Sequence, residues 1–120
     1  MTTVFSAKPP VAPYVPLPHE IERRRRIHLS VATYGYEIMD RPIMPDAVWD
    51  LMAQSVDRYQ GTGHPLVDEF FLTQFSPMTG MWIHNHPELD GIKRLFDQYW
   101  KAMADYFEER YKRGLLRGRS

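Results

Sequence analysis

Residues 27–52 read IHLSVATYGYEIMDRPIMPDAVWDLM, and the spacing of their apolar side chains predicts two helices joined by a proline-bounded turn. We expect the first helix from about His19 to Met39, with an inner face of Ile27, Val31, Tyr34 and Ile38. Pro42 ends it, because the residue before a proline disfavours helical geometry. We expect the second helix from Asp46, a good N-cap, to about Gln60. Its predicted inner face consists of Val48, Met52, Ser55, Val56 and Tyr59.

The same periodicity predicts a long last helix, beginning near Pro87 or Asp90 and ending near Leu115. Its apolar stripe consists of Ile92, Leu95, Phe96, Tyr99, Met103, Phe107 and Tyr111. The intervening segment is less regular: Leu66–Phe75 fits a short helix or an irregular apolar segment, and Met81–His84 fits a short strand. We therefore expect an all-α or nearly all-α fold, in which a helical hairpin, residues 19–60, packs on the last helix.

The two ends of the chain differ in composition from the rest. Residues 1–18 contain Pro9, Pro10, Pro13, Pro16 and Pro18, a spacing that blocks helix and central strand alike. We expect a proline-rich extended arm over residues 1–18, a single helical domain over residues 19–115 and a basic tail over residues 116–120.

Length and composition limit the possible functions. The chain has 120 residues, of which 43% are hydrophobic, so we expect one domain with a modest core. Lys and Arg number 15, as do Asp and Glu, so no net charge attracts the chain to DNA or membranes. The absence of cysteine excludes a disulfide scaffold and a thiol nucleophile. Because we find neither a membrane-length apolar run nor a signal peptide, we expect a cytoplasmic protein with no membrane partner.

Two aromatic residues lie on the sides of their predicted helices that face away from the expected core. Tyr36 points nearly opposite to the inner face of the first helix, since each residue advances by about 100°. Asp46, Trp49 and Asp50 share a stripe opposite the inner face of the second helix. In one interpretation, Asp46 is a cap, Asp50 is solvated and Trp49 packs on another element. In the other, these rings and carboxylates bind a flat cationic ring such as that of nicotinamide mononucleotide.

The same segment resembles a known family. Residues 34–52 are similar to the N-terminal helical domain of bacterial NAD-dependent DNA ligases, whose approximate pattern is Tyr-x-Tyr-[His or similar]-x-x-Asp-x-Pro-x-[Ile/Met]-x-Asp-x-x-Tyr-Asp-x-Leu. The most specific part is the run MDRPIMPDAVWDLM, residues 39–52. Its first Asp, its first Pro, its second Asp and its Trp-Asp pair have the same spacing as the corresponding positions of the family pattern.

In that family, this domain binds the nicotinamide mononucleotide half of NAD, while a neighbouring domain forms the lysyl-adenylate. The resemblance implies that Tyr36 packs on nicotinamide and that Asp46 and Asp50 are carboxylates needed for this half of the substrate. It also implies that Trp49 replaces a stacking Tyr. Glu37 stands where the family usually has His, and this change to an anion is expected to alter or abolish recognition on the phosphate side.

The rest of such a ligase is missing from the sequence. There is no Lys-x-Asp-Gly motif of the nucleotidyltransferase domain, and residues 61–120 show no resemblance to the family. We therefore expect a non-catalytic binding module rather than a ligase. Short free-standing ligase-related proteins are familiar from bacteriophage genomes, so the resemblance also implies a phage protein that acts in the host cytoplasm.

A second motif, MWIHNHP at residues 81–87, resembles the zinc-binding core of JAB/MPN-type metalloproteases. In that family a Ser eight residues and an Asp eleven residues past the second His complete the site. Asp97 matches the second of these positions, but Arg94 stands at the first. His84, His86 and Asp97 are therefore weak metal candidates, because zinc sites take three or four protein ligands. The alternative is that these histidines form a turn into the last helix, and we expect no metal.

Two basic blocks interrupt the even distribution of charge. They are Arg23–Arg26 and a C-terminal set made of Lys112, Arg113, Arg117 and Arg119. Arg23–Arg26 covers all faces of a helical turn, so we expect most of it to be solvated. Contact with nucleic-acid phosphates through these two blocks is a weaker alternative.

Three hypotheses for function follow from these observations. The first is recognition of NAD or nicotinamide mononucleotide by Tyr36, Glu37, Asp46, Trp49 and Asp50. The second is a protein-interaction or host-factor inhibitor role on the same scaffold, with Tyr36 and Trp49 as interface anchors. The third is a metal-dependent hydrolase that uses His84 and His86.

Overall fold

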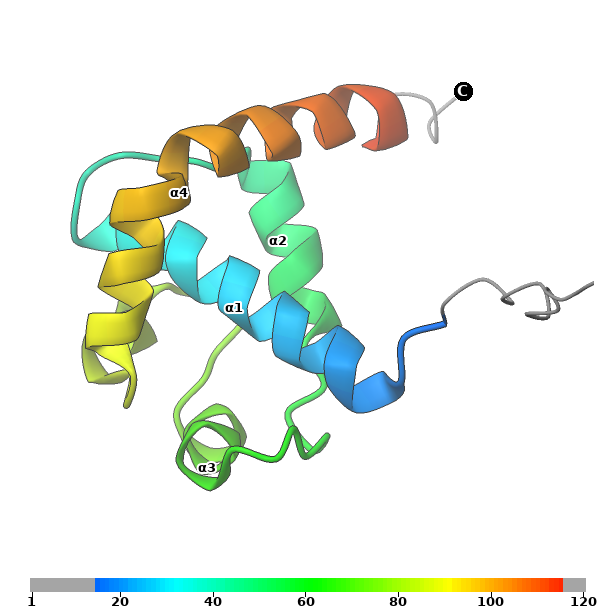
Figure 1. Cartoon of the computed structure of the whole chain (residues 1–120), viewed down its shortest axis with the longest axis vertical. Coiled ribbons are helices and arrows are strands. Elements are labelled where there is room, and N and C mark those ends of the chain that lie inside the picture. Colours follow the sequence, from blue (N-terminus) through cyan, green and yellow to red (C-terminus); the bar gives the residue numbers. More distant parts are fainter. Residues whose placement is uncertain (1–14, 116–120) are drawn as a thin grey trace, which may run out of the picture.

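The computed structural model describes residues 15–115, and its regular elements are helical throughout (Figure 1). In chain order they are α1 (Pro18–Glu37), α2 (Asp46–Ser55), α3 (Pro65–Thr73), the 3₁₀ helix η1 (Met81–Asn85), α4 (Leu89–Arg110) and a π-helical turn, η2 (Tyr111–Leu115). No strand occurs within residues 15–115, so the expected all-α class is confirmed. Residues 1–14 of the expected arm and the tail 116–120 lie outside the described residues. None of the described helices combines the length and apolar character that a membrane span requires.

Helix α1 is central, because α2, η1 and α4 all pack against it. Pro18 occupies the first turn of α1, where a backbone N–H would have no partner within the helix, so its absence is not destabilising. The Leu17 N–H donates to Glu20 Oε1 at 2.9 Å. Every residue from 29 to 35 is buried, so this part of α1 has no solvent-facing side. Val31 and Tyr34 are buried as predicted, whereas Ile27 and Ile38 are exposed. The one-face prediction was wrong at those two positions, because both lie outside the stretch 29–35 that is covered from several directions.

Helix α2 ends at Ser55, earlier than the predicted Gln60. Asp46 is its first helical residue and makes no side-chain capping bond, so its predicted role as N-cap was wrong; Pro45 precedes the helix instead. Ala53 is buried, and Val48, Trp49, Met52 and Val56 pack partly against the core. The predicted inner-face residues Ser55 and Tyr59 are exposed. The chain leaves the helix here because the carbonyls of residues 57 and 60 both turn back to Arg26 on α1.

Helix α4 packs against α1 and bends about halfway, so that its two halves follow different directions (Figure 1). Its first half packs through Phe96, whose ring centroid lies 5.5 Å from that of Tyr34. Its second half packs through Phe107, 5.6 Å from the ring of His28. This pairing confirms the prediction that the last helix packs on the N-terminal helix.

The segment between α2 and α4 contains an aromatic cluster. Phe70 and Phe71 on α3 pack with Phe75 and Trp82 at centroid distances of 5.2–6.1 Å. The predicted strand at Met81–His84 was wrong, because η1 occupies this position. Adjacent residues of a strand point to opposite faces, but the neighbours Trp82 and Ile83 are both buried. A tight helical turn, packed against α1 and α4, allows both neighbouring side chains to be buried.

Candidate functional site

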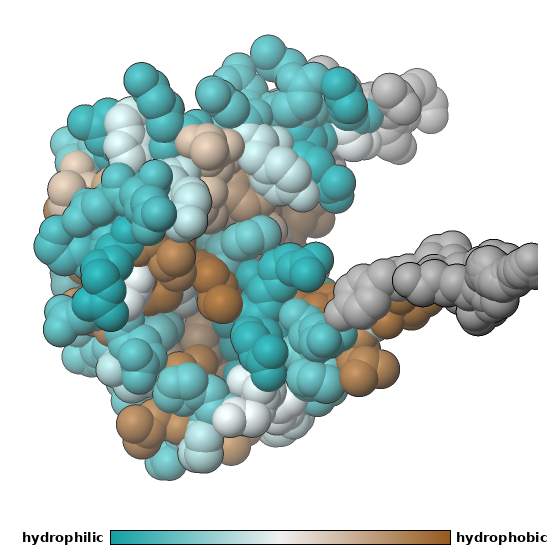
Figure 2. Space-filling view, viewed as in Figure 1, coloured by the Kyte–Doolittle hydropathy of each residue, from teal (hydrophilic) through white to brown (hydrophobic). Residues whose placement is uncertain are grey.

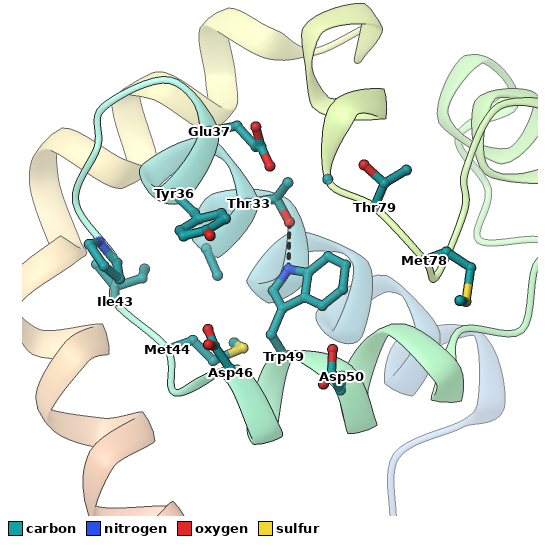
Figure 3. Close-up of a pocket in the computed structure, with 13 residues that line it drawn as sticks. Thr33, Tyr36, Glu37, Ile43, Met44, Asp46, Trp49, Asp50, Met78 and Thr79 are labelled. Atoms are coloured by element: carbon teal, nitrogen blue, oxygen red, sulfur yellow. Dashed lines mark hydrogen bonds between the residues drawn. The ribbon is translucent and has the colours of Figure 1, made fainter.

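The five side chains that the sequence nominates as ligand-binding residues line one cavity of about 370 Å³ (Figure 3). Tyr36 and Glu37 belong to the last turn of α1, and Asp46, Trp49 and Asp50 belong to α2. The turn between the two helices brings these faces together, with Ile43 and Met44 buried beneath it. The volume lies within the range typical of small-molecule sites.

Trp49 is fixed in this cavity by a hydrogen-bond chain. Its Nε1 donates to Thr33 Oγ1 at 2.9 Å, and Thr33 Oγ1 donates to the Leu29 carbonyl at 2.6 Å. The indole is half-buried and packs against the core, while it also lines the cavity. The ring therefore packs on α1, as the first interpretation expects, and it also forms one wall of the hollow, while ligand binding there stays a prediction.

Tyr36 has a different environment on the opposite side of the same cavity. Its side chain is 59% exposed, although neighbouring residues of α1 are buried. Figure 3 shows its ring projecting from α1 into the space between α1 and α2. A phenol in this position has room to pack against a planar group that enters between the helices.

Three carboxylates, those of Glu37, Asp46 and Asp50, line the cavity. None of the three forms a hydrogen bond or an ion pair with another described side chain. No Lys, Arg or His occurs among the described residues that line the cavity. The hollow is therefore strongly anionic, which suits a cationic occupant and opposes a free phosphate.

A third wall comes from residues that the sequence did not nominate. Met78, Thr79 and Gly80 precede η1 and close the side of the cavity opposite α2 (Figure 3). A methyl group added to Gly80 would lie 2.8 Å from Thr33 Cγ2 and 3.1 Å from Glu37 Cγ, so the backbone passes close over α1 because this residue is Gly. No helical periodicity links this loop to α1, so the sequence carried no signal for it.

The weak metal candidates do not converge. His84 is exposed on η1, whereas His86 is buried against the Phe70 ring, 5.2 Å between centroids. His86 Nδ1 accepts a hydrogen bond from the Glu88 N–H at 3.0 Å, and Asp97 pairs with Lys93 at 2.9 Å. Among residues 15–115, no three His, Asp or Glu side chains are grouped as a metal site requires. The histidines instead belong to the turn that leads into α4.

The basic block on α1 is not uniform. Arg23 and Arg24 are exposed, as expected, but Arg26 is almost fully buried and bonds to Glu22 and Asp68. Arg26 is the exception to the expectation that most of the block is solvated, because carboxylates and carbonyls of the fold surround it.

Comparison of the chain with protein-family models, with curated protein sequences and with solved structures finds no match.

Proposed function

We propose that the cavity between α1 and α2 binds the oxidised nicotinamide ring of NAD or nicotinamide mononucleotide, and that the protein acts as a binding module. One observation carries this proposal: two aromatic rings and three carboxylates converge on one cavity whose described lining has no basic side chain. The oxidised ring is flat and cationic. Aromatic faces attract such a ring, and the carboxylates add Coulomb attraction.

The aromatic pair supports stacking at a low entropic cost. Trp49 is already held by its bond to Thr33, so little side-chain freedom remains to be lost on binding. Tyr36 is exposed and has space to cover the other side of a ligand. Each cation–π contact contributes about 0.5–2 kcal/mol, depending on how far the site excludes water.

The phosphate of the nucleotide has no counterpart among the described lining residues. Glu37, which stands where the ligase family has His, adds a negative charge at the same place. In this proposal the ring and ribose enter the cavity, while the phosphate projects into solvent. Nicotinamide riboside is therefore expected to bind at least as tightly as nicotinamide mononucleotide, which separates this site from one that recognises phosphate.

Isothermal titration calorimetry with nicotinamide riboside, nicotinamide mononucleotide, NAD and NADH tests the proposal. We expect saturable binding of the three oxidised ligands and none of NADH, because the reduced ring is neutral. Asp50→Asn is expected to weaken binding roughly fivefold to tenfold, about 1–1.4 kcal/mol, through loss of one charge. Asp90→Asn is the matched control, since Asp90 is an exposed acid outside the cavity.

Two results would reject the nicotinamide proposal. One is the absence of heat with every oxidised ligand at millimolar concentration. The other is equal affinity for NAD and NADH, which would show that the ring charge plays no part. Circular dichroism of Asp50→Asn must match the unchanged protein, so that a loss of binding reports on the site and not on folding.

A second candidate function, protein binding, is favoured by a large open groove elsewhere on the molecule. The groove, about 1,090 Å³, lies between α1, α2 and the C-terminal half of α4. Exposed apolar residues Ile21, Leu51 and Tyr106 line it, together with basic residues such as Arg24 and Arg110. Trp49 itself is a poor anchor for a partner, because its N–H is already bonded to Thr33.

Site-specific photocrosslinking in the source cell tests protein binding. A benzoylphenylalanine at position 51, inside the groove, is expected to capture one partner that the same group at position 72 does not. Leu72 is the control because it is also exposed but lies outside the groove. Identical crosslinks from both positions would argue against a specific interface at this groove.

A further inference from the structure

A second cavity, of about 510 Å³, lies between α1, the start of α3 and the first half of α4. It shares no lining residue with the candidate nicotinamide site. Figure 2 shows hydrophobic side chains gathered at a hollow between α1 and α4, surrounded by hydrophilic ones. Its apolar wall consists of Ile27, Val67, Ile92 and Leu95. We call it the α1–α4 cavity.

Ser30 provides an unexplained polar group in the wall of the α1–α4 cavity. Its side chain is completely buried, and its Oγ has no hydrogen-bond partner in the structure. A buried hydroxyl without a partner destabilises the fold, because it has given up its hydrogen bonds to water. Thr33, one turn later, avoids that cost by donating to the Leu29 carbonyl, so the helix itself permits such a bond. Ser30 is also one of the residues that line the cavity, so its unpaired hydroxyl is the buried polar group that we assign to a ligand atom in the proposal below.

The charge around the α1–α4 cavity is positive. Arg23 and Arg94 line the cavity and are exposed. Neither of them forms an ion pair with a carboxylate of the described residues. Arg26 also lines the cavity, but Glu22 and Asp68 already neutralise it. The one carboxylate among the described lining residues is Glu88, whose Oε2 lies 3.5 Å from His64 Nε2.

Two further groups favour an anion at this position. The first turn of α4 lines the cavity through Gly91, and the N-terminal N–H groups of a helix carry partial positive charge. His86 Nδ1 accepts the Glu88 N–H, so the neutral imidazole carries its hydrogen on Nε2, as a donor. The polar groups of this wall are thus mainly donors, above an apolar floor.

We propose that the α1–α4 cavity binds a small organic carboxylic acid whose apolar body carries a second polar group. The carboxylate lies at the rim with Arg23 and Arg94, the apolar body contacts Ile27, Ile92 and Leu95, and the second polar group pairs with the Ser30 hydroxyl. A monoanion fits better than a dianionic phosphate, because Glu88 offsets one of the two available positive charges.

Matched small acids provide the probe for this cavity. 3-(4-Hydroxyphenyl)propionate has the carboxylate, the ring and the distal hydroxyl, 3-phenylpropionate lacks the hydroxyl, and tyramine replaces the acid with a cation. Calorimetry is expected to rank their affinities in that order, with no binding of tyramine. Amide shifts of Ser30 and Ile92 in nuclear magnetic resonance spectra are expected to move with the two acids.

Two variants separate ligand binding from a structural role. Ser30→Ala is expected to lower the affinity for 3-(4-hydroxyphenyl)propionate about fivefold and to leave 3-phenylpropionate unchanged, through loss of one hydrogen bond. Its melting temperature is expected to equal or exceed that of the unchanged protein, because the free protein gains nothing from this hydroxyl. Arg94→Gln is expected to weaken both acids severalfold, whereas Lys93→Gln, next to it but outside the cavity, does not.

Three results would overturn the proposal. If tyramine bound as tightly as the acids, the positive charge at the rim would not be what selects the ligand. Equal effects of Arg94→Gln and Lys93→Gln would show a general charge effect only. Failure of both acids to bind the folded protein at millimolar concentration would remove the site altogether. Each outcome is independent of nicotinamide binding, since the two cavities have separate walls.

Discussion

Arg26 bonds to three segments of the chain at once. Its Nε donates to Glu22 Oε2 and its Nη1 to Asp68 Oδ1, each at 2.9 Å. Its Nη2 donates to the carbonyls of Asp57 and Gln60, again at 2.9 Å. Glu22 and Arg26 are 1% and 2% exposed, so these charges are almost fully removed from water. A buried pair of this kind tolerates the loss of one partner poorly, because the other charge stays behind unpaired.

We predict that Arg26→Met lowers the free energy of unfolding by about 3–5 kcal/mol, the range for breaking a buried ion pair. Met keeps most of the length of the side chain, so the loss reports on the guanidinium and not on a cavity. Arg24→Met is the control: Arg24 is exposed, and its replacement is expected to change stability by less than about 0.5 kcal/mol. Urea unfolding followed by circular dichroism measures both, and similar losses would contradict this account.

Gly35 and Gly91 differ in how much room their surroundings leave for a side chain. A methyl group at position 35 would lie 2.7 Å from the Arg41 carbonyl and 2.7 Å from Phe96 Cε1. Helix α1 therefore approaches both the following turn and α4 more closely than any side chain permits. At position 91, in the first turn of α4, a methyl group would meet only Arg94, at 3.9 Å.

We predict opposite effects for the same substitution at these two glycines. Gly35→Ala is expected to destabilise the fold by about 1–3 kcal/mol, because Phe96 and the backbone of residue 41 must shift. Gly91→Ala is expected to stabilise it by about 0.5–1 kcal/mol, since Ala restricts the unfolded chain and favours the helix. Melting temperatures of the two variants check the signs; stabilisation by Gly35→Ala would mean that the helices are less closely packed than described.

Apolar periodicity in the sequence was sufficient to predict α1 and α4, because long helices repeat their core positions over several turns. It failed to predict where α2 ends, since Arg26 holds the backbone of residues 57 and 60 from a distant position. It also failed at η1, where an aromatic cluster formed by separate segments determines the conformation. Contacts between elements, which leave no local period, decided both cases.

In the candidate site, too, local periodicity predicts some residues, whereas contacts between elements determine the others. The sequence predicts Tyr36 and Trp49 because each departs from the period of its own helix, and both line the cavity. The wall formed by residues 78–80 was not predictable, because it depends on where the loop before η1 returns to α1. Arg26 gave no signal either: within four consecutive arginines, only the fold distinguishes the buried one from its neighbours.

At the scale of the whole molecule, three buried or bonded groups make stability depend on pH in the same direction. Burial lowers the pKa of His86 to about 4, with nearby His64 as a smaller cause. Burial and then Arg24 lower the pKa of His28. Burial alone raises the pKa of Asp68, but hydrogen bonds from Thr62 and the bonded charge of Arg26 outweigh it and lower the net pKa. In each case the unfolded chain binds protons more readily than the folded protein.

We predict that stability falls as the pH is lowered from about 6.5 to about 4, mainly because His86 stays neutral in the fold while its unfolded counterpart takes up a proton. With 1.36 kcal/mol for each pKa unit, this residue accounts for roughly 2–3 kcal/mol. His86→Asn keeps an acceptor for the Glu88 N–H and removes the titration, so its stability is expected to decline less over this interval. His84→Asn, an exposed neighbour, is expected to decline like the unchanged protein. Urea unfolding at pH 7.0, 5.5 and 4.5 measures the slopes, and equal slopes for the two variants would show that acid sensitivity arises elsewhere, in His28 or Asp68.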